Sequence, residues 1–253
     1  MECFQANYRV EARSDGLMEG MNLKLENYLS ESEISQSRTL KDFIEWFDQK
    51  LASTKVHREE LKKQNILHAG IAKKFYEELF PFYRLAQRKS EEWGDVKVTC
   101  VLGNQNFDVR LESSDNSIPR HIEITQADRD EEEHLRMLYF LEHSSVTMIG
   151  KVTKVGTKRT GLQILVKDEA GEGNKSILEK IGLIQKAIDR KIKVTQRPDM
   201  TALLVYFNDY LKYPRGKGQN ELDAFLSENE SWKPQYVRLF VVSASGELFW
   251  EKS

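Results

Sequence analysis

Two carboxylates, Asp108 and Glu123, lie in adjacent segments, FDVRLES and RHIEITQA, that alternate apolar and polar residues as half-buried β-strands do. Both fall on the polar faces of their strands, and the short polar loop between the segments predicts that the strands are neighbours. Two carboxylates that converge on one edge of a sheet can bind a hard divalent cation such as Mg²⁺ through oxygen. Such an ion activates water and stabilises charge on a phosphodiester during cleavage. The alternative is an ordinary solvated strand face, because Arg110 and Glu112 share the face of Asp108.

A third carboxylate, Glu78, belongs to a helical segment that precedes these strands. It lies seven residues after Ile71 and three after Phe75, so it points with the apolar stripe of the helix. The ordinary explanation is a position at the rim of that stripe, where the carboxylate reaches water. The stripe predicts a helix over about residues 58–88, with a kink or restart at Pro81.

Hydrophobic periodicity predicts an α/β protein with a mixed central sheet that is flanked by helices on both sides. The predicted helices cover about residues 40–51, 58–88, 129–143, 175–193 and 222–226, the long fourth helix being capped by Asn174. The predicted strands are a meander over 97–103, 107–113 and 120–127, a hairpin with glycine turns at Gly156 and Gly161, and two nearly all-apolar strands over 201–209 and 236–244.

The same pattern predicts how the chain is divided. Residues 1–57 form a polar arm, loosely attached up to about residue 36, followed by the first helix. Residues 58–253 form the α/β domain, with a helix-hairpin insertion at about 129–173. No internal repeat or low-complexity segment interrupts this order.

The segment NFDVRLESSDNSIPRHIEITQA and the order of the elements around it resemble the metal-binding core of the PD-(D/E)XK nuclease-like superfamily, over roughly residues 70 to 210. The resemblance implies a restriction-endonuclease-like core, Mg²⁺ or Mn²⁺ as cofactor, and endonucleolytic cleavage of DNA or RNA. It further implies that Asp108 and Glu123 hold the metal, with Glu78 as a third carboxylate. The occurrence of such folds in bacterial defence or mobile-element assemblies extends the analogy to a role of that kind.

One position departs from the pattern of the superfamily. Its lysine follows the third-strand acid by two residues, and Thr125 stands there in this sequence. Lys191, which helical spacing places with Gln185 on the apolar face of the long helix, is a physically reasonable replacement. The alternative for Lys191 is a snorkelling side chain at a helix end. Without a cation beside the scissile phosphate, transition-state charge is less well stabilised, so a catalytically inactive module that binds nucleic acid or a protein partner is the second hypothesis.

Basic residues occupy positions from which they could neutralise the phosphates of a nucleic acid. They lie on the predicted hairpin and the long helix: Lys154, Lys158, Arg159, Lys186, Arg190 and Lys193. The alternative is ordinary solubilising charge, since acidic runs such as DRDEEE lie nearby. A homodimer, or a protein partner within a larger complex, is compatible with the sequence.

Composition excludes several classes of protein. The chain has 253 residues, a formal net charge of −2 and two cysteines, too few for a disulfide scaffold or a zinc cluster made of cysteine alone. No apolar run approaches the roughly 18 to 20 residues of a membrane span, and the first residues lack a secretion segment, so a cytoplasmic protein without a membrane partner is expected. Nucleophile-elbow, Walker and zinc-protease motifs are absent from the sequence.

Overall fold

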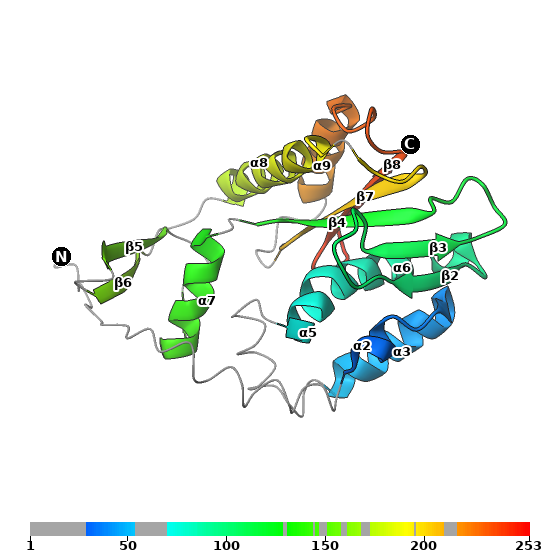
Figure 1. Ribbon diagram of the computed structural model, residues 1–253. Helices are drawn as coiled ribbons and strands as arrows, with labels where there is room; N and C mark the ends of the chain where they lie inside the picture. The colour runs from blue at the N-terminus through cyan, green and yellow to red at the C-terminus, as the bar shows by residue number, and fades with distance from the viewer. Residues whose placement is uncertain are drawn as a thin grey trace.

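The structure is a computed structural model of the 253-residue chain (Figure 1). It describes residues 29–53, 70–128, 131–143, 145–146, 151–157, 161–167, 173–194, 196–209 and 217–253. The helical elements are α2 (Glu31–Ile34), α3 (Leu40–Ser53), α5 (Gly70–Lys73), the π-helical turn η1 (Lys74–Leu79), α6 (Phe80–Trp93), α7 (Glu131–His143), α8 (Gly173–Ile192) and α9 (Lys217–Glu228). The strands are β1 (Arg38–Thr39), β2 (Lys97–Cys100), β3 (Val109–Glu112), β4 (His121–Ala127), β5 (Val152–Thr157), β6 (Gly161–Val166), β7 (Thr201–Phe207), β8 (Arg238–Ser243) and β9 (Phe249–Lys252).

A mixed seven-stranded sheet forms the centre of the fold, in the order β1-β2-β3-β4-β7-β8-β9. Strands β1 to β4 pair antiparallel, β4, β7 and β8 pair parallel, and β9 returns antiparallel. The predicted meander and the two buried strands are therefore confirmed, whereas β9 was not predicted, because its residues lack alternation. Strand β4 joins the antiparallel half of the sheet to the parallel half.

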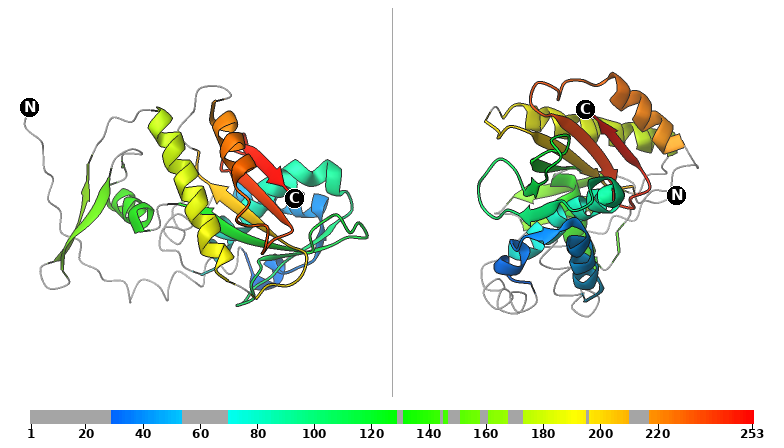
Figure 2. Two further views of the ribbon diagram at one scale, coloured as in Figure 1. Left: turned by 90° about the horizontal axis from the view of Figure 1, so that it is seen from above. Right: turned by 90° about the vertical axis from the view of Figure 1, so that its right-hand side faces the viewer.

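Helices cover both faces of this sheet, as Figures 1 and 2 show. The core on one face contains residues of α3 and α6, and the core on the other contains residues of α8 and α9. Strand β7 contributes to both, since Leu204 belongs to the first core and Leu203 to the second. Alternate residues of a strand point to opposite faces, so an apolar strand such as TALLVYF is stable only between two helical layers.

The N-terminal helix belongs to this fold rather than to a separate arm. Phe43 and Phe47 of α3 are almost completely buried, and the ring of Phe47 stacks on that of Phe75 at a centroid distance of 4.5 Å. Leu29 and Ile34 are buried in the same core, so the predicted loose attachment up to residue 36 is wrong for residues 29–36. The two apolar side chains were too widely spaced to show a helical period. Residues 1–28 and 54–69 lie outside the described part of the chain.

The helix before the meander contains the irregularity that Pro81 predicts. Residues Lys74–Leu79 form a π-helical turn between α5 and α6, and Pro81 is in the first turn of α6. A proline cannot donate the hydrogen bond to the carbonyl four residues earlier, and its ring crowds that carbonyl. The carbonyl concerned, that of Glu77, accepts a hydrogen bond of 3.3 Å from Nε2 of Gln126 in β4. The irregular turn is thereby tied to the strand that carries Glu123.

The insertion consists of α7 and the antiparallel hairpin β5–β6, which Figure 1 shows beside the main sheet. The backbone N–H of Val152 donates to Glu132 of α7 at 3.3 Å, which joins the hairpin to the helix. Gly156 pairs with Leu162 inside the hairpin and so lies in a strand, not in the predicted turn.

In the described portions of the chain, no helix combines the length and apolar character needed to cross a membrane.

Candidate functional site

Asp108 lies where β3 begins to separate from β4. Its backbone N–H still donates to the carbonyl of Ile122 at 2.8 Å, continuing the ladder by one residue beyond Val109. The next strand N–H, that of Ile124, donates at 2.7 Å to the Asp108 side-chain atom Oδ2. The carboxylate thus replaces the backbone partner that β3 no longer supplies. Its position is set by the sheet itself, because a buried N–H without an acceptor would cost free energy.

Glu78, on the π-helical turn η1, is brought to Asp108. Burial and the negative charge of Asp108 raise the pKa of Glu78 to about 7, although Lys74 binds its Oε2 atom at 2.5 Å. Burial likewise raises the pKa of Asp108, against the opposing effects of the Ile124 N–H, Lys74 and Lys191. The two carboxyls hydrogen-bond, and the bond favours the charged form of Asp108 and the neutral form of Glu78. Protonation of the pair is therefore expected to favour Glu78 over Asp108.

Glu123 faces different partners. It is only 5% exposed, because α8 covers the face of β4 that the sequence predicts to be solvated. Its Oε1 atom lies 2.8 Å from Nζ of Lys191, and its Oε2 atom accepts from Nε of Arg197 at 2.6 Å and from the hydroxyl of Tyr236 at 2.7 Å. Burial alone would raise the pKa of Glu123, but these three donors lower it below its ordinary value. Glu123 is therefore an ionised carboxylate with both oxygens engaged.

Two basic side chains from the last turn of α8 contact residues of β4. Lys191 binds Glu123, and the adjacent Arg190 donates to the hydroxyl of Thr125 and to the carbonyl of Gln126, each at 3.1 Å. The positive charge of Lys191 also acts on Asp108. The side chain predicted to replace the missing lysine thus lies beside the residues that the superfamily pattern associates with it.

Gln185, predicted to act beside Lys191, is not brought to this cluster. Its amide donates to Asp189 at 2.7 Å and accepts a hydrogen bond from Asn229, which follows α9. The two residues are six positions apart, and six residues of an α-helix turn through about 600°, so they do not share a face. The structure therefore does not place Gln185 with Lys191 and Glu123.

The described residues contain no group of three or more His, Cys, Asp and Glu side chains that could hold a metal ion as they stand. In the structure, Asp108 interacts with Glu78, whereas Glu123 binds Lys191, Arg197 and Tyr236. The expectation that Asp108 and Glu123 form the principal pair therefore differs from the observed arrangement. Their strands do place them side by side, but the cations of α8 and the following loop approach Glu123.

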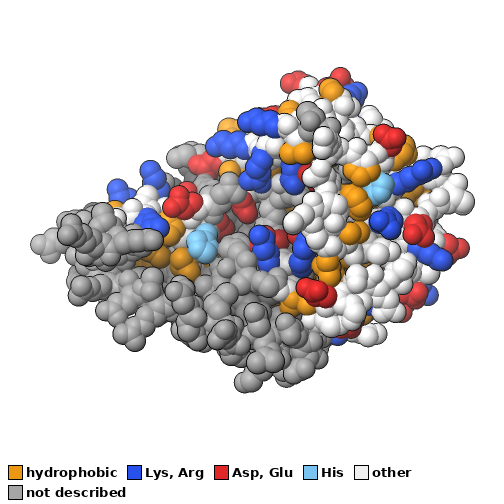
Figure 3. Space-filling view, viewed as in Figure 1, with side chains coloured by type: hydrophobic (Ala, Val, Ile, Leu, Met, Phe, Trp, Pro, Cys, Tyr) orange, Lys and Arg blue, Asp and Glu red, His pale blue; other side chains and the backbone are white. Residues whose placement is uncertain are grey.

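Lys and Arg side chains gather over α8 in Figure 3. Of the predicted nucleic-acid contacts, Lys186, Arg190 and Lys193 are exposed near α8, and Lys154 is exposed on β5. Lys158 and Arg159 lie outside the described residues. The exposed cations of α8 occupy the same helix that supplies Lys191.

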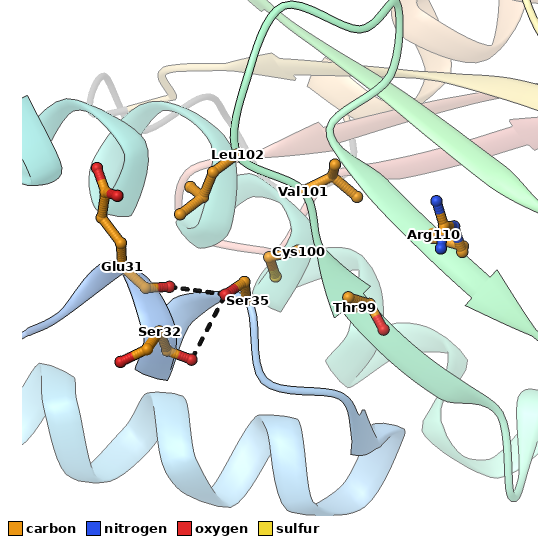
Figure 4. A pocket seen from close by; sticks show the side chains of 8 residues that line it. All are labelled: Glu31, Ser32, Ser35, Thr99, Cys100, Val101, Leu102 and Arg110. Carbon is orange, nitrogen blue, oxygen red and sulfur yellow. Dashed lines mark hydrogen bonds between the residues drawn. The ribbon is translucent and has the colours of Figure 1, made fainter.

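An open pocket lies against β2 (Figure 4). Its lining combines residues of α2 and the loop after it with residues of β2 and β3: Glu31, Ser32, Ser35, Thr99, Cys100, Val101, Leu102 and Arg110. None of the acidic site residues lines it. Burial raises the pKa of the Cys100 thiol to about 12, so this cysteine is protonated and a poor nucleophile at neutral pH.

Three contributors to the site were missed by sequence reasoning as site residues: Lys74, Arg197 and Tyr236. Lys74 precedes Glu78 by one helical turn, a spacing typical of an ion pair, and could have been found. Arg197 and Tyr236 lie in connections 74 and 113 residues beyond Glu123, and nothing in their local sequence points to it.

Comparisons of the chain with protein-family models, with curated proteins and with solved structures give no match. The site is therefore interpreted from its own geometry and from the chemistry of the residues that the sheet, the turn η1 and the helix α8 bring together.

Proposed function

We propose that this protein is a metal-dependent nuclease that hydrolyses phosphodiester bonds in DNA or RNA, with a core of the PD-(D/E)XK type. One observation carries the proposal: Lys191 reaches Glu123 at 2.8 Å and acts electrostatically on Asp108. This supplies, from a helix, the cation that Thr125 fails to supply. The order of helix, meander, helix and strand supports the proposal of a nuclease core of this type.

Asp108 and Glu78 are suited to a hard divalent cation. Two buried carboxyls whose pKa values are both raised would gain from an ion that neutralises their charges. Mg²⁺ or Mn²⁺ held there would lower the pKa of a bound water and offset the charge of the phosphate. Glu123 could join as a further ligand only by releasing Lys191, so we assign the metal to Asp108 and Glu78.

The residues of the chain then have distinct roles. Asp108 is aligned by the Ile124 N–H. Asp108 and Glu78 would hold the cation in their ionised forms, and Lys74 would remain near Glu78 as a counter-charge. Lys191 presents an ammonium group where negative charge develops on the phosphate, which is the usual way in which a fixed cation lowers a barrier. Exposed cations of α8 hold the flanking phosphates.

The first test measures cleavage of plasmid DNA, single-stranded DNA and RNA in the presence of EDTA, Mg²⁺ or Mn²⁺. We expect metal-dependent cutting that falls at least about 100-fold in Asp108→Asn and Glu78→Gln, the scale of losing one charge-stabilising group. Asn at 108 keeps an oxygen for the Ile124 N–H, so the fold is spared. Asp115→Asn, an exposed carboxylate of the β3–β4 loop, is the control. Cutting that is undiminished in both site variants would exclude this assignment.

A second candidate is a catalytically inactive module that binds nucleic acid. It is favoured by Glu123, whose two oxygens are already engaged by two cations and a hydroxyl, leaving this half of the site with a net positive charge. This candidate predicts nucleic-acid binding that is independent of divalent cations. Calorimetry distinguishes the two, because a specific Mg²⁺ or Mn²⁺ site that disappears in Asp108→Asn supports the nuclease.

A further inference from the structure

Arg197 binds both the backbone carbonyl of Lys191 and the carboxylate partner of the Lys191 ammonium group. Its Nε donates to Glu123, the carboxylate that binds the Lys191 ammonium, and its Nη2 donates to the backbone carbonyl of Lys191 itself. Its Nη1 donates to the carbonyl of Val194, just after α8. The Arg197 side chain is only 3% exposed, so it is part of the packed interior rather than a surface charge. A guanidinium group has five donors in a rigid plane, which suits it to such a connection.

Tyr236, in the connection that leads to β8, completes the arrangement. Its hydroxyl donates to Oε2 of Glu123 at 2.7 Å, and its ring lies 4.4 Å from the guanidinium carbon of Arg197. Two donors thus hold the same carboxylate oxygen. The other oxygen, Oε1, is left to Lys191.

Lysine is a poor choice for a precisely placed charge unless its neighbours restrain it. Its stem has four rotatable methylene groups, and ordering them costs conformational entropy. Lys191 is 26% exposed, so packing alone does not restrain its ammonium group. Fixing both its backbone carbonyl and its carboxylate partner removes most of that freedom before a substrate binds.

We propose that Arg197 and Tyr236 are positioning residues, which hold Glu123 and the last turn of α8 so that the Lys191 ammonium stays at Oε1 of Glu123. The inference rests on the proposed nuclease function. In it, Glu123 is the residue that orients the Lys191 side chain. Arg197 and Tyr236 act through Glu123 and Lys191, and neither contacts the substrate.

The test compares Tyr236→Phe and Arg197→Lys with the wild type, using the full chain and the best cleaved substrate from the first experiment. Both variants keep most of the buried volume. Tyr236→Phe loses the hydroxyl donor to Oε2 of Glu123. Arg197→Lys replaces the planar guanidinium, which binds Glu123 and the carbonyls of Lys191 and Val194 together, by a single ammonium group. We expect kcat to fall by roughly 10-fold or more, the usual effect of losing a supporting hydrogen bond, with KM changed less than threefold. Tyr83→Phe is the matched control, because the Tyr83 hydroxyl binds Asp48 at 2.5 Å in the helical layer on the other face of the sheet.

A second readout requires no catalysis. Competitive acetylation followed by mass spectrometry reports how accessible each lysine ammonium is. Lys50 is the internal reference, because it forms a 2.7 Å ion pair with Glu33 and is 18% exposed. We expect Lys191 to be labelled several-fold faster, relative to Lys50, in Tyr236→Phe and Arg197→Lys than in the wild type. In Tyr83→Phe the ratio should stay at the wild-type value.

The outcomes separate this inference from the function on which it rests. If the wild type cuts but the two variants keep both kcat and the labelling ratio of Lys191, the positioning role is wrong and the nuclease stands. If both variants lower kcat with KM changed less than threefold, and both raise the labelling ratio of Lys191, the inference is supported. If the wild type cuts no substrate, the nuclease proposal fails, and an unchanged labelling ratio would then overturn the restraint of Lys191 as well.

Discussion

At the scale of single residues, the site contains three buried carboxyl groups whose pKa values shift in different directions. Burial and the charge of Asp108 raise the pKa of Glu78, and burial raises the pKa of Asp108. Glu123 is buried as well, yet its donors lower its pKa. Carboxyl groups whose environments push their pKa values in opposite directions are a frequent mark of functional sites, although ion-pair networks produce the same effect.

The Glu78 carboxyl makes a prediction about stability and pH. Its pKa is about 7 in the folded protein and near 4.5 ordinarily, so between these values the folded state binds more protons than the unfolded state. The free energy of unfolding should therefore fall as pH rises through this window. Glu78→Gln, which cannot ionise, should be more stable than the wild type at pH 8 by on the order of 1 kcal/mol and about equal at pH 5.

Denaturant unfolding at pH 5, 6, 7 and 8 measures this difference. Adding Mg²⁺ supplies a second check, because a cation between two carboxylates should stabilise the wild type more at pH 8 than at pH 5 and should not stabilise Asp108→Asn. Parallel pH curves for the wild type and Glu78→Gln would show that Glu78 titrates normally.

At the scale of elements, α8 is the part of the fold that joins hydrophobic packing to the site. Ile184 and Ile188 are buried against the sheet, in the core that also contains α9. Lys191 follows Ile188 by three residues, so it lies on nearly the same side of the helix. The depth at which Ile188 packs therefore sets how far Lys191 reaches over β4.

Ile188→Ala should consequently affect both stability and catalysis. Truncating a fully buried isoleucine costs about 2 to 5 kcal/mol through lost burial and the cavity that remains. Leu226→Ala, in α9 of the same core, should cost a similar amount but leave Lys191 in place. At a temperature where both variants are folded, only Ile188→Ala should lower kcat. Equal losses of activity in the two variants would mean that general loosening of the core, rather than the placement of α8, controls the rate.

At the scale of the whole molecule, the site lies where the two halves of the sheet meet. Strand β4 pairs antiparallel with β3 on one side and parallel with β7 on the other. A strand in that position is covered by helices on both faces, so polar side chains on it must find partners within the protein. Under the proposed function, a protein with a net charge of −2 would recognise a nucleic acid through local positive charge, and Lys and Arg side chains gather over α8 (Figure 3).

Binding of nucleic acid should therefore be strongly salt-dependent although the protein is nearly neutral. We expect the logarithm of the affinity for a short duplex, measured in EDTA, to fall linearly with the logarithm of the salt concentration. Replacing both Lys186 and Lys193 by Gln should make the slope shallower by about 2, and Lys41→Gln, an 84% exposed lysine of α3, should leave it unchanged. An unchanged slope in the double variant would place the nucleic-acid surface elsewhere.

Much of the element order follows from hydrophobic period alone. The meander, the two apolar strands and the long helix are local patterns of period two or 3.6, and each one appears in the structure close to its predicted residues. The choice of Asp108 and Glu123 also depended on local position, since both lie on the polar faces of neighbouring predicted strands, whereas the superfamily resemblance added Glu78 and Lys191. Residues 29–36 and β9 were misread because their apolar residues are few and their burial depends on distant partners.

The sequence by itself determined the class of the fold and the residues that would come near one another at β3, β4 and α8. Only the tertiary structure decided which charges pair. The register of β3 against β4 and the covering of β4 by α8 bring Arg197 and Tyr236, from remote connections, to Glu123 and leave Glu78 to Asp108. Periodicity reports which face of an element is buried, but the partner of a buried charge depends on contacts between segments about a hundred residues apart, which no local pattern records.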